Sequence, residues 1–304
     1  MRTIKKYDVI IIGGSYAGLS AAMSLGRSRR NVLILDSGLP CNRQTPHSHN
    51  FITQDGVSPG EIAAKAKEQV LRYDTVQFKN ALAVDAVKME ESFEVITADK
   101  ETFSAKKLIF ATGVADQMQN IKGFSECWGI SVIHCPYCHG YEFRDEKTAI
   151  LASDETIVHM SPLIANLSKD FTVLTNGPAT LSEEQKQLLT KNKVYIVEAE
   201  ITEIVHENGY VKRVVFKDSS SQEVRAIYAP LPFKQHSDIP EKLGCELNES
   251  GYVKIDDFFS TTVPGVLACG DNTGKGRSVA FAVHSGGMAG AVANKLLADE
   301  AFAS

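Results

Sequence analysis

The residues Tyr7-Asp8-Val9-Ile10-Ile11-Ile12-Gly13-Gly14-Ser15-Tyr16-Ala17-Gly18 set the architecture of this chain. A short apolar run ends at a glycine-rich turn, and an alanine-rich helical pattern follows over residues 19–25. A second apolar run, residues 31–35, ends at Asp36. A strand, a glycine turn, a helix and a second strand closed by an acid form a dinucleotide-binding unit. The sequence therefore predicts an α/β fold that begins with such a unit.

The glycine-rich turn supplies five candidate cofactor-binding residues: Gly13, Gly14, Ser15, Ala17 and Gly18. Glycines let the backbone approach a pyrophosphate, which then lies at the N-terminus of the helix. Asp36 is predicted to accept hydrogen bonds from the adenosine ribose. Ser15 is a departure, because this position of the motif usually holds its middle glycine.

A second motif, His134-Cys135-Pro136-Tyr137-Cys138-His139, indicates redox chemistry. Two cysteines separated by two residues close a very short disulfide ring, which forms and breaks easily. If the motif opens a helix, the backbone N–H groups favour a thiolate at the first cysteine. A neighbouring histidine exchanges the accompanying proton near neutral pH. Cys135, Cys138 and His139 are therefore the predicted catalytic residues.

Two other interpretations of the cysteine pair stay open at this point, a structural zinc site and a pair of buried, inert thiols. A zinc site usually requires a second ligand pair at comparable spacing. The other cysteines stand singly in the sequence, at Cys41, Cys127, Cys245 and Cys269. We therefore predict no metal site.

Composition bounds the function further. The chain has 304 residues, enough for two domains, and its 43% hydrophobic and 23% charged content is typical of globular proteins. A net charge of −5 gives nucleic-acid binding no electrostatic support. Lys5 and Lys6 lead straight into a strand without a signal peptide, and no apolar run is long enough to span a bilayer. We expect a cytoplasmic protein.

The middle of the chain repeats the first unit in weaker form. Strand-like runs at 148–152 and 171–174 flank a helical pattern at 157–167, and Ser182 with Gln185 predicts a capped helix. Asn208-Gly209 predicts a hairpin. After Pro230 and Pro232, a short strand is expected at 251–256 and a final helix at about 278–297. The predicted fold is thus two Rossmann-like dinucleotide-binding domains with parallel sheets and inserted β-meanders.

Together these residues resemble the thioredoxin-reductase-like flavoproteins over nearly the whole chain. The motifs that carry the resemblance are Gly13–Gly18 with Asp36, Ala111-Thr112-Gly113, the Cys135–Cys138 pair, and Thr262-Val263-Pro264-Gly265 through Gly270-Asp271. The resemblance implies an FAD-binding domain, residues 1–114 and 232–304, split by a second domain at 115–231. It also implies a homodimer.

The resemblance further implies roles for individual residues. Cys138 would face the flavin, Cys135 would exchange with the substrate, and Asp271 would contact the ribityl chain. The other implied cofactor-binding residues are Asn50, Thr112, Gly113, Gly270, Arg277, Ser278 and Val279. Ser278 departs from the family, which usually has glutamine there.

A narrower resemblance rests on Cys-Pro-Tyr-Cys-His-Gly-Tyr-Glu (135–142), with Leu25-Gly26-Arg27 and Asp55-Gly56. These residues are similar to the branch that contains dithiol oxidases of gliotoxin- and holomycin-type metabolites. Typical thioredoxin reductases have an acid–base aspartate after the second cysteine, and His139 stands there in this chain.

We therefore expect an FAD-dependent dithiol/disulfide oxidoreductase whose partner is a small-molecule dithiol or disulfide, or a thioredoxin-like protein. The alternatives are an NAD(P)H-dependent thioredoxin-reductase-type enzyme and an FAD-binding redox sensor with little turnover. NAD(P)H binding is doubtful, because Ala152-Ser153-Asp154-Glu155-Thr156 lacks the expected glycines and residues 175–180 contain no basic side chain.

Overall fold

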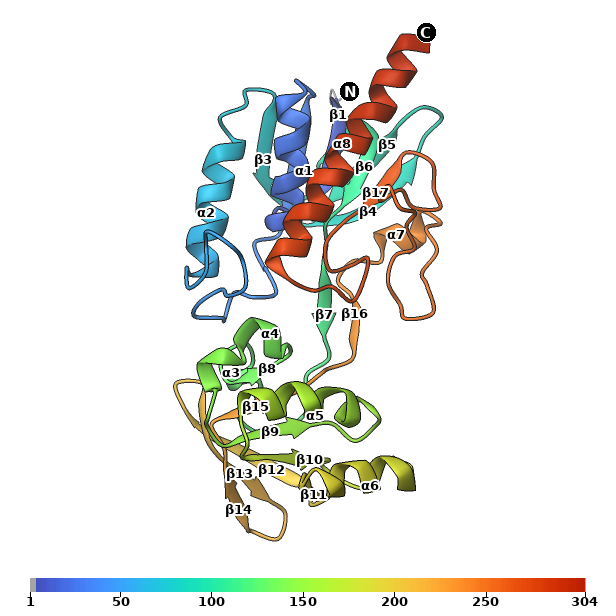
Figure 1. Ribbon diagram of the computed structural model, residues 1–304. Helices are drawn as coiled ribbons and strands as arrows, with labels where there is room; N and C mark the ends of the chain where they lie inside the picture. Colours follow the sequence, from blue (N-terminus) through green and yellow to red (C-terminus); the bar gives the residue numbers. More distant parts are fainter. Residues whose placement is uncertain (1–3, 304) are drawn as a thin grey trace. The chain divides into compact units, whose positions relative to one another are not determined.

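A computed structural model describes residues 4–303, which form two compact units (Figure 1). The first unit comprises the chain up to Arg43, Pro59–Ala115 and the chain from Phe233 onward. The second comprises Gln44–Ser58 and Asp116–Pro232. The chain leaves the first unit along β7 (Val114–Asp116) and returns along β16 (Phe233–Gln235), and these two strands pair with each other.

The first unit is built on one mixed sheet. Its elements are β1 (Lys5–Ile12), α1 (Tyr16–Arg27), β2 (Val32–Asp36), α2 (Pro59–Val70), β3 (Val76–Asn80), β4 (Ala83–Lys88), β5 (Phe93–Thr97), β6 (Thr102–Phe110), α7 (Ile239–Lys242), β17 (Val266–Ala268) and α8 (Val279–Ala303).

Strand β6 is shared between two kinds of pairing. Along one edge it runs parallel to β1, which continues the parallel layer through β2 and β3. Along its other edge, residues 102–105 pair antiparallel with β5, whereas residues 108–110 pair parallel with β17. Strand β4 extends the antiparallel part beyond β5. The parallel strands therefore end together, at the edge that carries the glycine-rich turn.

Helices α1 and α8 pack backbone against backbone (Figure 1). A Cβ atom added at Gly286 or Gly290 would lie 2.0 or 2.4 Å from a carbonyl oxygen of α1. Ser20 and Ser24 of α1 donate hydrogen bonds of 2.6 and 3.0 Å to carbonyl oxygens of α8. The alanine- and glycine-rich sequence of α8 is thus explained by the close approach of the two helices.

The second unit contains a parallel sheet and a separate meander. Its elements are α3 (Phe124–Cys127), β8 (Val132–Ile133), α4 (Pro136–His139), the 3₁₀ helix η1 (Tyr141–Phe143), β9 (Thr148–Leu151), α5 (Thr156–Leu167), β10 (Phe171–Leu174), α6 (Glu183–Lys191), β11 (Tyr195–Val197), β12 (Ile201–Glu207), β13 (Tyr210–Phe216), β14 (Ser221–Glu223) and β15 (Ala226–Tyr228).

The parallel sheet of the second unit has the order β11-β10-β9-β15-β8 and is buried on both faces. Ile150, Val173 and Tyr228 pack on the side of α5, while Leu151 and Ile227 pack toward the β12–β13 hairpin. Neighbouring residues in a strand point to opposite faces, which explains the continuous apolar runs of these strands.

The structure confirms the predicted α/β class with parallel sheets and meanders. The capping box of Ser182 and Gln185 is present at α6, and Asn208-Gly209 turns the β12–β13 hairpin with positive φ at both residues. Among the described residues, no helix combines the length and the apolar character needed to cross a bilayer.

The strand predicted at 251–256 is wrong, because only isolated bridges occur there, Leu247 to Val253 and Ile255 to Thr261. The side chain of Asn248 accepts hydrogen bonds from the N–H groups of Ser250 and Tyr252, and Gly251 has a φ of 82°. These contacts turn the chain where the sequence predicted extension. The final helix begins at Val279 and continues to Ala303, six residues past the predicted end.

Gly290→Ala is expected to lower the free energy of unfolding by about 1–3 kcal/mol, because its methyl group would overlap a carbonyl of α1. Gly60→Ala is the matched control, since Gly60 lies in α2 with nothing within 4 Å of an added Cβ. That change should be neutral or stabilising by up to about 1 kcal/mol. Urea unfolding of both variants measures the difference, and equal destabilisation would contradict the packing argument.

Candidate active site

The glycine-rich turn of the first unit depends on the absence of side chains. Gly13 has a φ of 104°, and an added Cβ would lie 2.1 Å from the carbonyl oxygen of Ala111 at the end of β6. A Cβ at Gly18 would lie 1.8 Å from the carbonyl oxygen of Gly13. The turn is therefore pressed between the carboxyl end of the sheet and the start of α1. Ser15 occupies the position before α1 in an extended conformation, so its side chain is accommodated.

Asp36 closes the same turn from β2. One carboxylate oxygen accepts the N–H of Gly14 at 2.8 Å, and the other accepts the N–H of Gly38 at 2.5 Å. A carboxylate has about four acceptor positions, so both oxygens keep capacity for a ribose hydroxyl. The structure thus fixes Asp36 in place through the backbone of the turn itself.

A second loop reaches the same edge of the sheet from β17. Asn272 is completely buried, and its amide nitrogen donates to the carbonyl oxygen of Phe110 at 3.0 Å and to Oγ1 of Thr112 at 3.3 Å. Its amide oxygen, Oδ1, has no hydrogen-bond partner within the described part of the chain. Gly270 approaches Ala17 of α1, since an added Cβ would lie 3.0 Å from the Ala17 Cβ.

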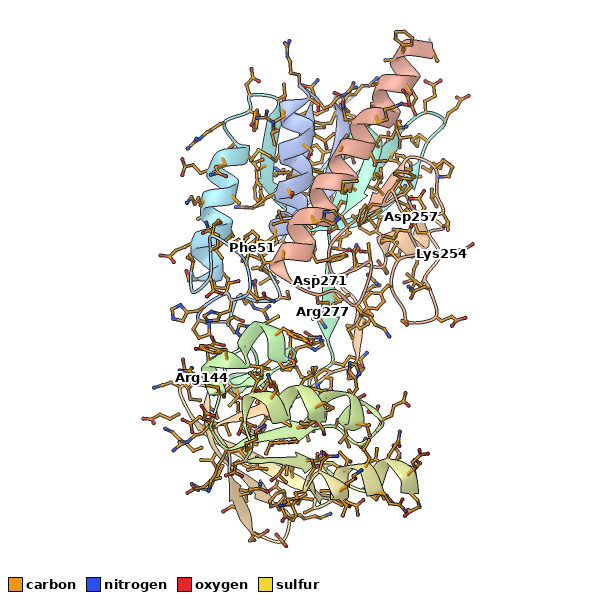
Figure 2. The ribbon with its side chains drawn as sticks, viewed as in Figure 1. Phe51, Arg144, Lys254, Asp257, Asp271 and Arg277 are labelled. Atoms are coloured by element: carbon orange, nitrogen blue, oxygen red, sulfur yellow. The ribbon has the colours of Figure 1, made fainter. Side chains whose placement is uncertain are left out.

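Asp271 and Arg277 come from this same loop and lie next to each other (Figure 2). Arg277 Nε is 3.8 Å from an Asp271 carboxylate oxygen, and both side chains are largely buried. Ser278 Oγ accepts the N–H of Phe281, so Ser278 caps α8, which begins at Val279. The serine that departs from the family pattern therefore has a helix-capping role.

These residues fit a dinucleotide cofactor. Without a Cβ at Gly13, the backbone can approach a pyrophosphate at the start of α1, and the carbonyl end of Asn272 is a buried acceptor without a partner. Sequence reasoning missed Asn272, although it directly follows Gly270-Asp271. Gly113 lies at the same edge with a φ of 65°. Asn50 belongs to the second unit and donates its N–H to Asp55, and its contact with the cofactor stays a prediction.

The cysteine motif lies at the carboxyl edge of the second unit's parallel sheet, directly after β8. Cys135 is extended and stands before α4, and Pro136 is the first helical residue, so the motif does open a short helix. The sulfur atoms of Cys135 and Cys138 are 2.9 Å apart, and both residues are half-buried. The two thiols are therefore close enough to exchange a disulfide between them.

Gly140 holds the cysteine helix against the unit. An added Cβ would lie 2.3 Å from the carbonyl oxygen of Pro136 and 2.4 Å from the side chain of Leu167 at the end of α5. Its N–H donates to the same Pro136 carbonyl at 2.8 Å. Glycine at this position lets the short helix α4 lie directly on α5.

His139 stands immediately after Cys138 in a polar cluster. Burial lowers the pKa of His139 below its ordinary value, the carboxylate of Glu142 opposes that shift, and His49 adds to it. The His49 and His139 rings meet edge to face, with centroids 6.0 Å apart. His139 is thus largely neutral at physiological pH and able to accept a proton.

Tyr228 ends β15, beside β8, and is fully buried. Burial, together with the smaller effect of the nearby Glu142 carboxylate, raises the pKa of Tyr228 to about 12. Its hydroxyl has no hydrogen-bond partner among residues 4–303. The phenol therefore stays protonated. Its O–H group is a hydrogen-bond donor near Glu142, which follows the cysteine motif. No local sequence pattern indicates a role for this residue.

The remaining cysteines differ from the pair. Burial raises the pKa of Cys127 to about 11 and that of Cys269 to about 12, and it also raises the pKa of Cys245. These three thiols stay protonated and unreactive. Cys41 is exposed, in the first unit. Within the described residues, no group of three or more His, Cys, Asp or Glu side chains is arranged to hold a metal ion.

The turn after β9 in the second unit is closed by hydrogen bonds within the chain itself. Asp154 accepts the N–H of Thr156 at the start of α5, at 3.0 Å. The N–H and hydroxyl of Thr180 both donate to the carbonyl oxygen of Ser153, at 2.7 and 2.9 Å. Glu198 accepts the N–H of Ala179 at 2.8 Å. The loops after β9 and β10 are therefore tied together, and their charged side chains are acidic.

Comparison with known proteins identifies the class of enzyme. The family described as "Pyridine nucleotide-disulphide oxidoreductase" matches residues 7–286. The thioredoxin reductase tcpT of Claviceps purpurea is 34% identical, and the match covers 98% of this chain and 97% of that protein.

Two solved structures have the same fold over nearly their whole length. An oxidoreductase from Agrobacterium tumefaciens is 39% identical with a TM-score of 0.89, and the match covers 96% of this chain and 98% of that one. The structure of HlmI is 28% identical with a TM-score of 0.92, covering 97% and 94%.

The chain belongs to the pyridine nucleotide-disulphide oxidoreductases, among their thioredoxin-reductase-like members. It is a flavin-dependent disulfide oxidoreductase, and the family binds FAD.

We predict that the purified protein is yellow and that heat denaturation releases FAD, not FMN. Gly14→Ala should weaken FAD retention about tenfold or more, because the added Cβ would lie 2.6 Å from both the Asp36 carboxylate and the Phe78 ring. Gly60→Ala, in open space, should retain FAD like the parent. Flavin content after dialysis checks this, and equal retention by both variants would contradict the assignment.

Proposed function

We propose that this protein is an FAD-dependent dithiol/disulfide oxidoreductase in which Cys135 and Cys138 exchange two electrons with an external dithiol or disulfide. The main support is the pair of thiols, 2.9 Å apart, with a half-buried and largely neutral histidine directly after the second one. Turnover distinguishes this function from that of an FAD-binding redox sensor.

FAD, when bound, supplies a two-electron store for the cysteine pair. The chain's own residues perform the thiol chemistry. The incoming thiol loses its proton to His139 and attacks one sulfur of the oxidised pair, forming a mixed disulfide while the other cysteine leaves as a thiolate. The second thiol of the substrate then displaces the first cysteine. The substrate leaves as a disulfide, and its two protons remain with Cys135 and Cys138.

We infer that the substrate is a small-molecule dithiol and that the nicotinamide route is lost. The similarity of residues 135–142 to the branch of small-molecule dithiol oxidases supports the first part. The second part is supported by the loop after β9. Asp154 already occupies the first N–H groups of α5, where a phosphate would bind, and its negative charge repels an anion. Thr180 closes the same turn by bonding Ser153.

The two cysteines are expected to trap substrate differently. In Cys138→Ser, the mixed disulfide formed at Cys135 cannot be resolved, so a covalent adduct with a small disulfide should accumulate. In Cys135→Ser, adduct formation should be at least about tenfold slower. Both changes are made in a Cys41→Ser background, since Cys41 is exposed. Mass spectrometry without reductant measures the adduct, and similar yields from both variants would reverse or remove the assignment.

Anaerobic stopped-flow mixing tests the electron route. Micromolar NADPH or NADH is expected to give no rapid, saturable bleaching of the flavin, whereas a small dithiol should bleach it. The physical reason is the acidic, self-bonded turn at Ser153–Glu155. Saturable bleaching by either nucleotide would instead establish an ordinary NAD(P)H-dependent thioredoxin-reductase-type enzyme.

A further inference from the structure

We propose that His49, which lies far from the cysteine motif in sequence, is a positioning residue of the dithiol site. It holds Glu142 in place and opposes the effect of Glu142 on His139, so that His139 stays in the neutral form that accepts a thiol proton. The proposal rests on the function proposed above. It adds a residue from the 44–58 segment to chemistry that the sequence located only at 134–142.

The segment that carries His49 has a defined shape. Ser48 and Val57 form an isolated antiparallel bridge, with the Ser48 N–H donating to the Val57 carbonyl at 2.8 Å. Within this loop, Asp55 accepts the N–H of Asn50 at 2.8 Å, and Asn50 has a positive φ of 57°. The loop belongs to the second unit, although in the sequence it stands between two segments of the first. His49 is therefore held by a closed local structure.

The imidazole of His49 lies between two carboxylates. Its Nδ1 is 3.6 Å from Asp55, and its Nε2 is 3.4 Å from Glu142, with 21% of its side chain exposed. The imidazole therefore restrains the side chain of Glu142 on one side and is itself restrained by Asp55 on the other.

The titratable groups of this site come from three parts of the second unit. The segment of His139 contributes Cys135, Cys138 and Glu142, with His134 just before them. From the 44–58 loop, His49 meets His139, while His47 and Asp55 lie next to His49; from β15, Tyr228 lies near Glu142. Tyr228 stays protonated. Of the charged neighbours, Glu142 raises the pKa of His139 and His49 lowers it, both against a dominant lowering by burial.

The two neighbours thus act on His139 in opposite directions. During thiol–disulfide exchange, the S–H bond of the incoming thiol breaks and an N–H bond forms on His139. That proton later returns to the leaving cysteine sulfur. If His139 were already protonated, it could not accept the proton, so the rate falls as the pH drops through its pKa. This fall in rate is the acidic limb of the pH–rate profile. The limb must then shift in one direction when Glu142 is removed and in the other when His49 is removed.

The experiment compares His49→Gln, Glu142→Gln and His47→Gln with the parent holoprotein. His47 is the matched control because it is in the same loop but bonds the Gly56 carbonyl through Nδ1 and, among residues 4–303, bridges no carboxylates. The probe is dithiothreitol, and the reading is its rate of reduction of the oxidised cysteine pair at about pH 5–8, the range in which histidine titrates. The thiols of dithiothreitol also titrate, but this affects the parent and the three variants equally.

We expect the acidic limb to move to higher pH in His49→Gln, with exchange at about pH 6 slowed about threefold to tenfold. It should move to lower pH in Glu142→Gln and stay in place in His47→Gln. A purely structural role would slow exchange at all pH values without moving the limb. Limbs that move together, or a His49→Gln profile like that of His47→Gln, overturn the inference. Failure of the parent protein to exchange at all would instead overturn the proposed function.

Discussion

Contact between backbone atoms is the constraint on which the first unit depends. Gly13 and Gly18 bring the turn after β1 against β6 and against itself, and Gly286 and Gly290 bring α8 onto α1. Any side chain at these positions would overlap a carbonyl oxygen. Glycine therefore allows both the tight turn at the carboxyl edge and the helix pair that covers the neighbouring strands.

In the second unit, the carboxyl edge of the parallel sheet carries different groups. The turn after β9 is closed by Asp154 and Thr180, while the end of β8, separated from β9 by β15, carries the two thiols. Parallel sheets place their ligand sites at this edge because the loops after successive strands converge there. The unit thus combines a parallel sheet with a thiol site at its edge.

Local sequence patterns made much of the fold predictable. The strand–turn–helix unit at 7–36, the capping box at Ser182 and the hairpin at Asn208-Gly209 are each specified by a few neighbouring residues, and the structure has all three. The interactions of Asn272, Tyr228 and His49 were not predictable, because each depends on contacts between distant segments. The strand expected at 251–256 was wrong for a related reason, since the side chain of Asn248 competes for the backbone N–H groups.

The interleaved course of the chain also bears on how it is made. By the time residue 232 leaves the ribosome, every residue of the second unit has been synthesised, so that unit can fold during translation. The first unit must wait, because β17 and α8 come from the last forty residues and complete the edge of β6 and the cover of α1. Until then, the small-residue face of α1 has no partner helix. A nascent chain stalled before β17 should therefore be the stage at which this protein most needs a chaperone.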